Sequence, residues 1–375
     1  MLFTYLAPFR DMLVLARQAR QVQADPGFIV GPIAAIFGFI LDLVFNLVYA
    51  ITPSNSLGFA IILLTIIAML IMLPLGVKGQ KSMTKMQQLA PEQEKIKAKY
   101  GDSKDPEIKR KIQQETQALY AKHKINPLGG CLPMLIQMPL FFGLLFIMQN
   151  SFMYVGTLNS LYVELAEAIQ AVPGYMDIAG PLSLQFIPDA WQATGARIIA
   201  YINTGMSYPE AVAIAGGNYI NIANPEHLAR VLNRFQSADW QALFAAIPDT
   251  YMPRIQELYD HRALVVNFFG LPLLENSGMR WPGIMIPIFT VLGTLATSWL
   301  TQLVNKPRDE RAKTQQTMMM VVMPIFMGFI TVTMPAGVGL YWIFSNLFRL
   351  VQQFVLNAKA GVKFRLPFTK ASELD

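Results

Sequence analysis

Five long apolar segments, separated by polar ones, set the pattern of this chain. Each runs for about 18 residues or more and holds at most one charged residue. A helix of about 20 residues crosses a ~30 Å hydrocarbon layer, whereas buried helices of soluble proteins rarely run so far without a polar face. We therefore predict an all-α polytopic membrane protein with five spanning helices. These are 59–77, 128–150, 281–304, 317–334 and 337–356.

The N-terminal segment, residues 1–58, leaves two arrangements open. Residues 1–25 read as a short basic helix, and Phe28–Ile51 is apolar apart from Asp42 and Asn46. These two lie four residues apart and share one helical face. Such a helix suits the membrane–water interface. It is also long enough to form a sixth span.

The polar segment 78–127 predicts a helical hairpin, with arms at about 80–100 and 106–124. Asp105 is placed to cap the second arm, and Pro106 suits the first helical position. The apolar positions of both arms are sparse, so the hairpin lacks a sizeable core and should project as a mobile paddle. Its lysines form either a solvated face or a contact surface for anionic lipid, RNA or an acidic partner.

The other long polar segment, 151–280, predicts a small all-α insert, because it shows helix signals and no strand alternation. Residues 207–217 read as one short helix. Asn224 can cap another, with Pro225 at its first position. The apolar stripe of that helix has helical spacing. It consists of Leu228, Val231, Leu232 and Phe235.

Composition agrees with a membrane protein: 53% of the residues are hydrophobic and 14% are charged, against about a quarter charged in soluble domains. Basic residues then orient the spans. Residues 78–127 carry 12 Lys or Arg against 6 Asp or Glu, whereas 151–280 carry 6 Arg, no Lys and 11 Asp or Glu. The short segment 305–316 and the tail 357–375 are basic as well. Under the positive-inside rule these three basic segments are cytoplasmic and the insert is extracytoplasmic.

Catalytic and metal-binding chemistry is not indicated. The single cysteine excludes an intrachain disulfide, and the three histidines lie far apart without ligand spacing. We expect no metal, no cofactor and no enzymatic activity. The alternative function is a solute channel or secondary transporter, which usually shows internal repeats and a paired polar site at the membrane midplane; neither is visible.

Four sequence blocks carry a resemblance to a known family. They are IILLTIIAMLIMLPLGVKGQKSMTKMQQLAPE at 61–92, NPLGGCLPMLIQMPLFFGLLF at 126–146, TMMMVVMPIFMGFI at 317–330 and PAGVGLYWIFSNLFRLVQQ at 335–353. In order, spacing and topology the chain resembles the YidC/Oxa family of membrane protein insertases. The resemblance covers about 28–150 and 264–357.

The resemblance implies a five-helix core in the bacterial cytoplasmic (inner) membrane that inserts other membrane proteins, alone or with the Sec translocon. A hydrophilic groove, open to the cytoplasm and the lipid, would take up hydrophilic segments and release hydrophobic ones into the bilayer. The expected partners are nascent membrane proteins and the lipid bilayer. The hairpin and basic tail would serve contacts with Sec, the ribosome and signal-recognition components. The insert would cap the outer side of the groove, bind a partner, or only add stability.

The candidate groove residues are the few polar groups of the predicted spans, together with neighbouring aromatics. Polar groups at membrane depth are costly and tend to line water or protein. The candidates are Gln137, Arg349, Asn346, Gln353, Thr65, Met69, Tyr341 and Trp342. Asn346, Arg349 and Gln353 share one helical face.

One position departs from the family pattern. The resemblance implies an arginine in the first core span, where this chain has Met69. Met69 lies roughly 15 Å and Arg349 roughly 18 Å from the outer ends of their predicted helices, at 1.5 Å per residue. We hypothesise that Arg349 supplies the groove charge from the opposite wall; the alternative is that it reaches toward cytoplasmic headgroups.

The remaining candidates also have two interpretations. Thr65 either lines the groove or hydrogen-bonds to its own helix. Tyr341 and Trp342 either contact a sliding substrate helix or anchor their helix at the interface.

Overall fold

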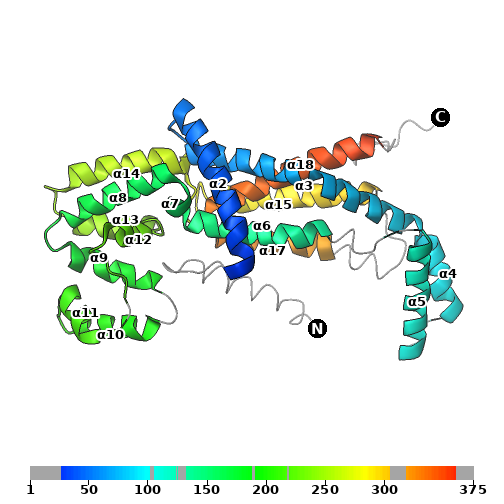
Figure 1. The fold of residues 1–375 in the computed structure, drawn as a ribbon, viewed down its shortest axis with the longest axis horizontal. Helices are drawn as coiled ribbons and strands as arrows, with labels where there is room; N and C mark the ends of the chain where they lie inside the picture. Colours follow the sequence, from blue (N-terminus) through cyan, green and yellow to red (C-terminus); the bar gives the residue numbers. More distant parts are fainter. Residues whose placement is uncertain are drawn as a thin grey trace. The chain divides into compact units, whose positions relative to one another are not determined.

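The computed structural model describes residues 27–101, 105–123, 125, 132–187, 191–217, 219–304 and 318–359. The expectations for the basic N-terminal helix, for the loop 305–316 and for the tail beyond 359 lie outside these residues. The described chain is almost entirely α-helical (Figure 1). It forms two compact units. The first comprises Met1–Thr65, Met138–Ile288 and Phe329–Trp342, and the second comprises Ile66–Gln137, Phe289–Gly328 and Ile343–Asp375.

Helices of the predicted spans are present, although their ends differ from the predicted ones. They are α3 (Ser56–Gln88), α6 (Leu132–Gln149), α15 (Met285–Val304), α17 (Met323–Val332) after a π-helical turn η4 (Met318–Val322), and α18 (Ala336–Lys359). Among the described residues, two helices are long and apolar enough to cross a membrane. They are Val30–Ile51, in α2 (Gly27–Ile51), and Ser56–Ser82.

The first arm of the predicted hairpin is not a separate helix over 80–100. The long helix α3 continues to Gln88 without a break, and α4 (Ala90–Tyr100) starts after Leu89. Pro91 explains the break, because proline has no N–H to donate to the carbonyl four residues earlier and its ring collides with that carbonyl. The predicted apolar span and the start of the hairpin are therefore one continuous helix.

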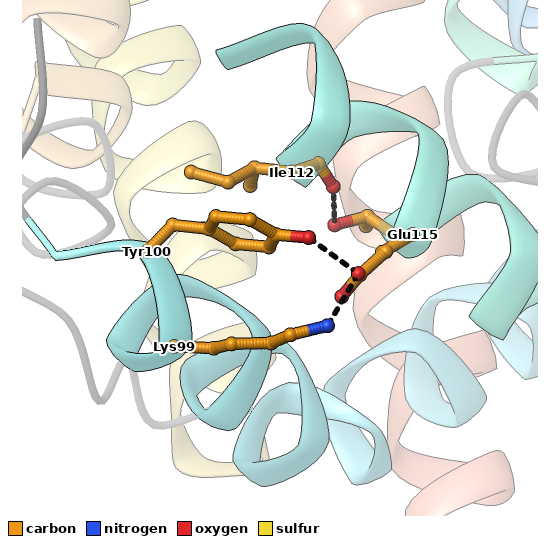
Figure 2. Close-up of polar contacts among 5 residues, drawn as sticks. Lys99, Tyr100, Ile112 and Glu115 are labelled. Atoms are coloured by element: carbon orange, nitrogen blue, oxygen red, sulfur yellow. Dashed lines mark hydrogen bonds and ion pairs between the residues drawn. The ribbon is translucent and has the colours of Figure 1, made fainter. Parts of the chain in front are cut away.

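The second arm is α5 (Pro106–Lys122), and its predicted cap is confirmed: Asp105 accepts a hydrogen bond from the Glu107 amide at 2.9 Å. None of the described residues of α5 is buried, which agrees with the expected thin apolar seam. Glu115 joins the two arms by accepting from Lys99 at 2.7 Å and from the Tyr100 hydroxyl at 2.6 Å (Figure 2). These bonds hold the pKa of the Glu115 carboxyl below its ordinary value, with the Lys99 bond as the larger cause.

The predicted insert packs around α8 (Gly156–Gln170), α12 (Pro225–Leu232) and α14 (Met252–Val266). The Asn224 side chain caps α12 through the Glu226 amide at 2.9 Å, as predicted. The expected apolar stripe is fully buried, although α12 ends at Leu232 and Phe235 follows outside the helix. The short helix α11 (Tyr208–Ala215) also lies where the sequence placed it.

Other helices complete the insert. They are α7 (Ser151–Tyr154), α9 (Tyr175–Ser183), the 3-10 turn η2 (Leu184–Phe186), α10 (Gln192–Asn203) and α13 (Ser237–Ala246).

The insert also holds one short element that was not predicted. It is an antiparallel hairpin of two-residue strands, β1 (Asn267–Phe268) and β2 (Leu271–Pro272). Strands this short have no room for an alternating pattern of apolar and polar residues. The turn residues Phe269 and Gly270 have positive φ angles of 48° and 82°.

A buried arginine lies at the centre of the insert. The guanidinium of Arg262 lies over the rings of Trp240, Tyr162 and Tyr259, at 4.9 to 5.5 Å from their centroids. Its Nε donates to the Tyr162 hydroxyl at 2.8 Å. Cation–π contacts of this kind strengthen when water is excluded, so Arg262 connects α8, α13 and α14.

Candidate functional site

Two predicted groove residues from different helices contact each other directly. Arg349 in α18 donates from Nη2 to Oε1 of Gln137 in α6, at 2.7 Å. Both residues belong to the second unit. A hydrogen bond with a charged donor is stronger than one between neutral groups. Hydrogen-bonding to Gln137 fixes where the guanidinium of Arg349 lies, although that side chain remains exposed.

A third predicted residue, Asn346, hydrogen-bonds to α15, a helix that contributed no candidate groove residue. Its Nδ2 donates to Oγ1 of Thr294 in α15 at 3.1 Å, and Asn346 is buried. Gly293 makes this approach possible: a Cβ atom there would lie 3.1 Å from Cβ and 3.3 Å from Nδ2 of Asn346. One face of α18 therefore bonds to both α6 and α15.

Hydroxyl groups form a stripe on α15 around this contact. Thr290, Thr294 and Thr297 are spaced i, i+4 and i+7, which puts them on one face. Thr294 donates to the Thr290 carbonyl at 2.7 Å, and Thr297 donates to the Gly293 carbonyl at 3.0 Å. This spacing is the signal that would have identified Thr294. It is weak, because threonine hydroxyls in helices commonly bond to their own backbone.

The C-terminal half of α18 also approaches α3 closely. A Cβ atom on Gly76 would lie 3.1 Å from Nε2 of Gln352. The predicted residue next to it, Gln353, is half-buried. Within the second unit, α18 thus presents amide groups to α3, α6 and α15.

The first predicted span offers no free polar group at the two predicted positions. Met69, where the family pattern has arginine, is only 4% exposed. Thr65 is buried, and its hydroxyl donates to the Ile61 carbonyl at 2.7 Å. The interpretation that Thr65 bonds within its own helix therefore matches the structure.

The two predicted aromatics lie in the first unit. Tyr341 is buried, and the ring of Trp342 lies 5.0 Å from that of Phe141, centroid to centroid. Both side chains therefore make packing contacts within the first unit.

Within the first unit, hydrogen bonds connect the insert to the C-terminal end of α6 and to the N-terminal ends of α3 and α18. At the end of α6, Arg234 donates to Asn150 at 2.6 Å. At the start of α18, the Ala336 amide donates to the Glu275 carbonyl at 2.8 Å. Just before α3, the Asn55 amide donates to the carbonyl of Leu264 at 2.8 Å.

These ties reach further into the insert. Glu275, which is buried, accepts from the amide and hydroxyl of Ser237 at the start of α13. Buried carboxylates are costly unless they are hydrogen-bonded. The connection between α13 and the start of α18 is therefore specific.

The described residues hold no group of three or more His, Cys, Asp or Glu side chains that could bind a metal ion. The polar groups of the site are amides, hydroxyls and one guanidinium. They can hydrogen-bond a polar segment and attract negative charge.

Comparisons with known proteins agree with the resemblance. A relative in Anaeromyxobacter sp. (strain Fw109-5), named membrane protein insertase YidC, is 32% identical over 188 residues, which are 46% of this chain and 32% of that protein. The Bacillus subtilis protein named membrane protein insertase MisCA is 41% identical over 116 residues, 31% of this chain and 41% of its own length. A Caulobacter vibrioides protein named membrane protein insertase YidC is 49% identical over 105 residues, 28% of this chain and 15% of that protein.

The chain thus spans less than half the length of these curated relatives. The family model described as 60Kd inner membrane protein matches residues 48–178 and 235–363. The insert residues between these ranges fall outside the match. Since the match covers well over half of the chain, the chain belongs to this family of bacterial inner membrane proteins, the YidC/Oxa family.

Proposed function

We propose that this chain is a membrane protein insertase. It takes hydrophilic segments of nascent membrane proteins into a groove open to the cytoplasm and releases their hydrophobic segments into the bilayer, alone or beside the Sec translocon. The names of its relatives support this function.

The observation that carries the proposal is the hydrogen bond between Arg349 and Gln137. Both lie in apolar helices, where polar groups are costly unless they line water or pair with one another. Asn346 and Thr294 add a second polar contact to the same face of α18. Together they would keep a groove hydrated and shorten the apolar barrier that a polar segment must cross.

Arg349 would also supply the positive charge that Met69 lacks. A guanidinium held toward α6 attracts the acidic residues of an entering segment. The Arg349 side chain is exposed, so a substrate can reach it. Arg349 and Gln137 are therefore the residues we assign to substrate contact, with Asn346 and Thr294 beside them.

We further propose five spans and an interfacial α2. Asp42 in the middle of α2 accepts from the Gly156 amide at 3.0 Å, and Thr157 donates to Asn46 at 3.2 Å. Gly156 begins α8 of the insert, which we propose lies on the extracytoplasmic side. If α2 crossed the bilayer, Asp42 would lie near its midplane and could not reach Gly156.

The exposed residues of α2 agree with this placement. Large apolar side chains recur at helical spacing on its open side. They are Ile36, Phe39, Leu43 and Leu47. We propose that this stripe faces lipid while the Asp42 side faces the insert.

For the insert we propose the role of an extracytoplasmic cap. Its hydrogen bonds to the ends of α3, α6 and α18 hold those ends at fixed positions. Water entering from the cytoplasm would then stop below them. The helical hairpin, whose second arm has no buried residue among those described, would meet Sec, the ribosome or signal-recognition components on the cytoplasmic side.

Complementation tests the function. The chain is expressed in bacteria depleted of their own insertase, and protease protection reports insertion of a small double-spanning substrate. Purified protein in Sec-free vesicles shows whether insertion is independent. We expect insertion in both systems. If neither system inserts the substrate although the protein folds in the membrane, the proposed function is wrong.

A further inference from the structure

The turn of the β1–β2 hairpin carries a large apolar side chain into the open. Phe269 is 76% exposed. Leu264, on the preceding helix α14, is exposed as well. Exposed apolar groups that gather at one place usually mark a contact surface.

The backbone at this turn does not favour phenylalanine. Phe269 and Gly270 both have positive φ, which is the pattern of a two-residue type I′ turn. Asparagine, aspartate and glycine suit its first position, whereas a bulky aromatic residue there is an outlier. The Phe269 ring meets the rings of Phe268 and Phe59 edge-on, with centroids 4.8 and 6.4 Å apart, yet most of its surface remains exposed.

The turn is held against the first turn of α3. The Phe269 amide donates to Oδ1 of Asn55 at 2.6 Å. The ring of Phe59 meets that of Phe268 edge-on, with centroids 5.3 Å apart. Gly58 makes room for this contact, because a Cβ atom there would overlap the Phe268 ring.

This position corresponds to a particular depth. Helix α3 is apolar enough to cross a membrane from Ser56 onward, and Phe59 and Leu63 are exposed on its surface. Under the proposed topology, the start of α3 lies at the extracytoplasmic boundary of the bilayer. Aromatic side chains are enriched at this boundary.

We propose that the hairpin turn is a lipid anchor: Phe269 inserts into the interfacial region of the extracytoplasmic leaflet beside the start of α3, and so holds the insert on the membrane surface. The partner is the phospholipid bilayer itself. This inference rests on the proposed topology, and it adds a lipid contact to the proposed role of the insert.

Site-specific fluorescence tests the anchor. In full-length protein with Cys131→Ser, Phe269→Cys carries an NBD fluorophore and is reconstituted into phosphatidylethanolamine–phosphatidylglycerol vesicles. The control is Ile214→Cys, because Ile214 is also apolar and exposed but lies in α11. We expect shallow nitroxide-labelled lipids to quench the label at 269 several-fold more than that at 214, and aqueous iodide to do the reverse. Equal iodide quenching at both sites would overturn the proposal.

A second set of variants separates lipid contact from folding. With the fluorophore on Leu264→Cys, we expect Phe269→Trp to keep lipid quenching and Phe269→Asn to lose most of it. Phe269→Asn loses the edge-on contacts with the rings of Phe268 and Phe59 but places a residue that suits the turn, so the unfolding temperature should change little. If it falls and the helical circular dichroism is lost, the ring is a folding element and the anchor proposal is wrong.

The insertion assay distinguishes this failure from failure of the proposed function. If iodide quenches the label at 269 in a protein that inserts substrates, only the anchor proposal is wrong. If lipid quenches the label at 269 in a protein that inserts no substrate, the anchor proposal stands and the proposed insertase function is wrong.

Discussion

The hydrogen bond between Arg349 and Gln137 joins the one charged side chain of the predicted last span to an amide of the predicted second span. Removing either partner leaves the other without this bond. A hydrogen bond to a charged group contributes about 1.5–3 kcal/mol. The two residues should therefore behave as a coupled pair.

We predict that Arg349→Ala and Gln137→Ala each lower insertion of a substrate with an acidic tail several-fold, and that Arg349→Lys retains part of the activity. The double variant should lose less than the sum of the two single losses, because the second change removes a bond that is already broken. Protease protection of the substrate in vesicles measures this.

Arg254→Ala is the matched control, since Arg254 is an exposed arginine of the insert that pairs with Glu257 at 2.9 Å. Exposed pairs of this kind contribute little, so insertion should not change. Normal insertion by Arg349→Ala together with impaired insertion by Gln137→Ala would refute the idea that Arg349 supplies the groove charge.

Gly293 provides a second test at this scale. A methyl group there would crowd Asn346 at 3.1 Å, so the Asn346 side chain has to shift by a few tenths of an ångström and its bond to Thr294 weakens. We predict that Gly293→Ala destabilises the protein by about 1–3 kcal/mol, the usual cost of overpacking. Unfolding in detergent measures it. Gly156→Ala, where a Cβ meets nothing within 4 Å, should be neutral or slightly stabilising; an equal loss in both would contradict the packing argument.

Single polar residues in apolar runs could be recognised from the sequence, because they are few and their cost is known. Their partners could not. Helical spacing places Asn346 and Arg349 on one face, but it does not say which helix lies opposite that face. Thr294 was missed because threonine can satisfy its hydroxyl within its own helix and so carries little signal.

At the scale of elements, local chemistry was predictable where it depends on neighbouring residues. Asp105 and Pro106 define the start of α5 through contacts with their immediate neighbours in the sequence. The join between α3 and the hairpin was missed, because a drop in hydrophobicity does not end a helix. The helix is interrupted only near Pro91, well beyond the end of the predicted span 59–77. The β1–β2 hairpin was missed because strands of two residues are too short to show an alternation of apolar and polar residues.

The Glu115 contacts make the hairpin sensitive to pH. The hydrogen bonds from Lys99 and then Tyr100 lower the pKa of Glu115 from its ordinary value of 4.5. The contribution of ionised Glu115 to the stability of the hairpin is therefore present above pH 4.5 and is lost as the pH falls through the lowered pKa. The pKa of Lys99 is raised from 10.5, chiefly by Glu115. Its contribution is present below 10.5 and is lost as pH rises through the raised value.

We therefore predict that amide protection in the α4–α5 hairpin is constant from mildly acidic to mildly alkaline pH and falls at both extremes. Hydrogen exchange of the full chain, corrected for the intrinsic rate at each pH, measures it. In Glu115→Gln the fall in acid should disappear. The control variant Glu94→Gln changes an exposed glutamate of α4 and should keep the fall in protection at acid pH. If that fall disappears in both variants, it is caused by the overall charge of the hairpin and not by the Glu115 contacts.

At the scale of the whole molecule, the charge bias of the polar segments predicts an orientation without any knowledge of contacts, because it follows a rule on loops. The ties between the insert and the membrane helices could not be foreseen. Arg234, Glu275 and Leu264 come from different parts of the insert. Leu264 and Glu275 make these bonds through backbone carbonyls, which every residue has, so their side-chain types give no signal.

Helix α2 decides the topology of the N-terminal segment. If it lies in the interface, both of its ends are extracytoplasmic; if it spans, its first residue is cytoplasmic. In a Cys131→Ser background, single cysteines replace Phe28 and Ser54 at the two ends, Glu257 in the insert, and Gln113 in the hairpin. An impermeant maleimide is then added to spheroplasts before or after permeabilisation.

We predict that the cysteines at 28, 54 and 257 react in intact spheroplasts, and that the one at 113 reacts only after permeabilisation. The reason is the Asp42–Gly156 hydrogen bond, which keeps the middle of α2 on the same side as the insert. Reaction at 54 but not at 28 in intact cells would show a sixth span. Asp42 would then lie at membrane depth, and its contact with Gly156 would have to be broken in the bilayer. Reaction at 113 before permeabilisation would reverse the orientation and remove the cytoplasmic groove altogether.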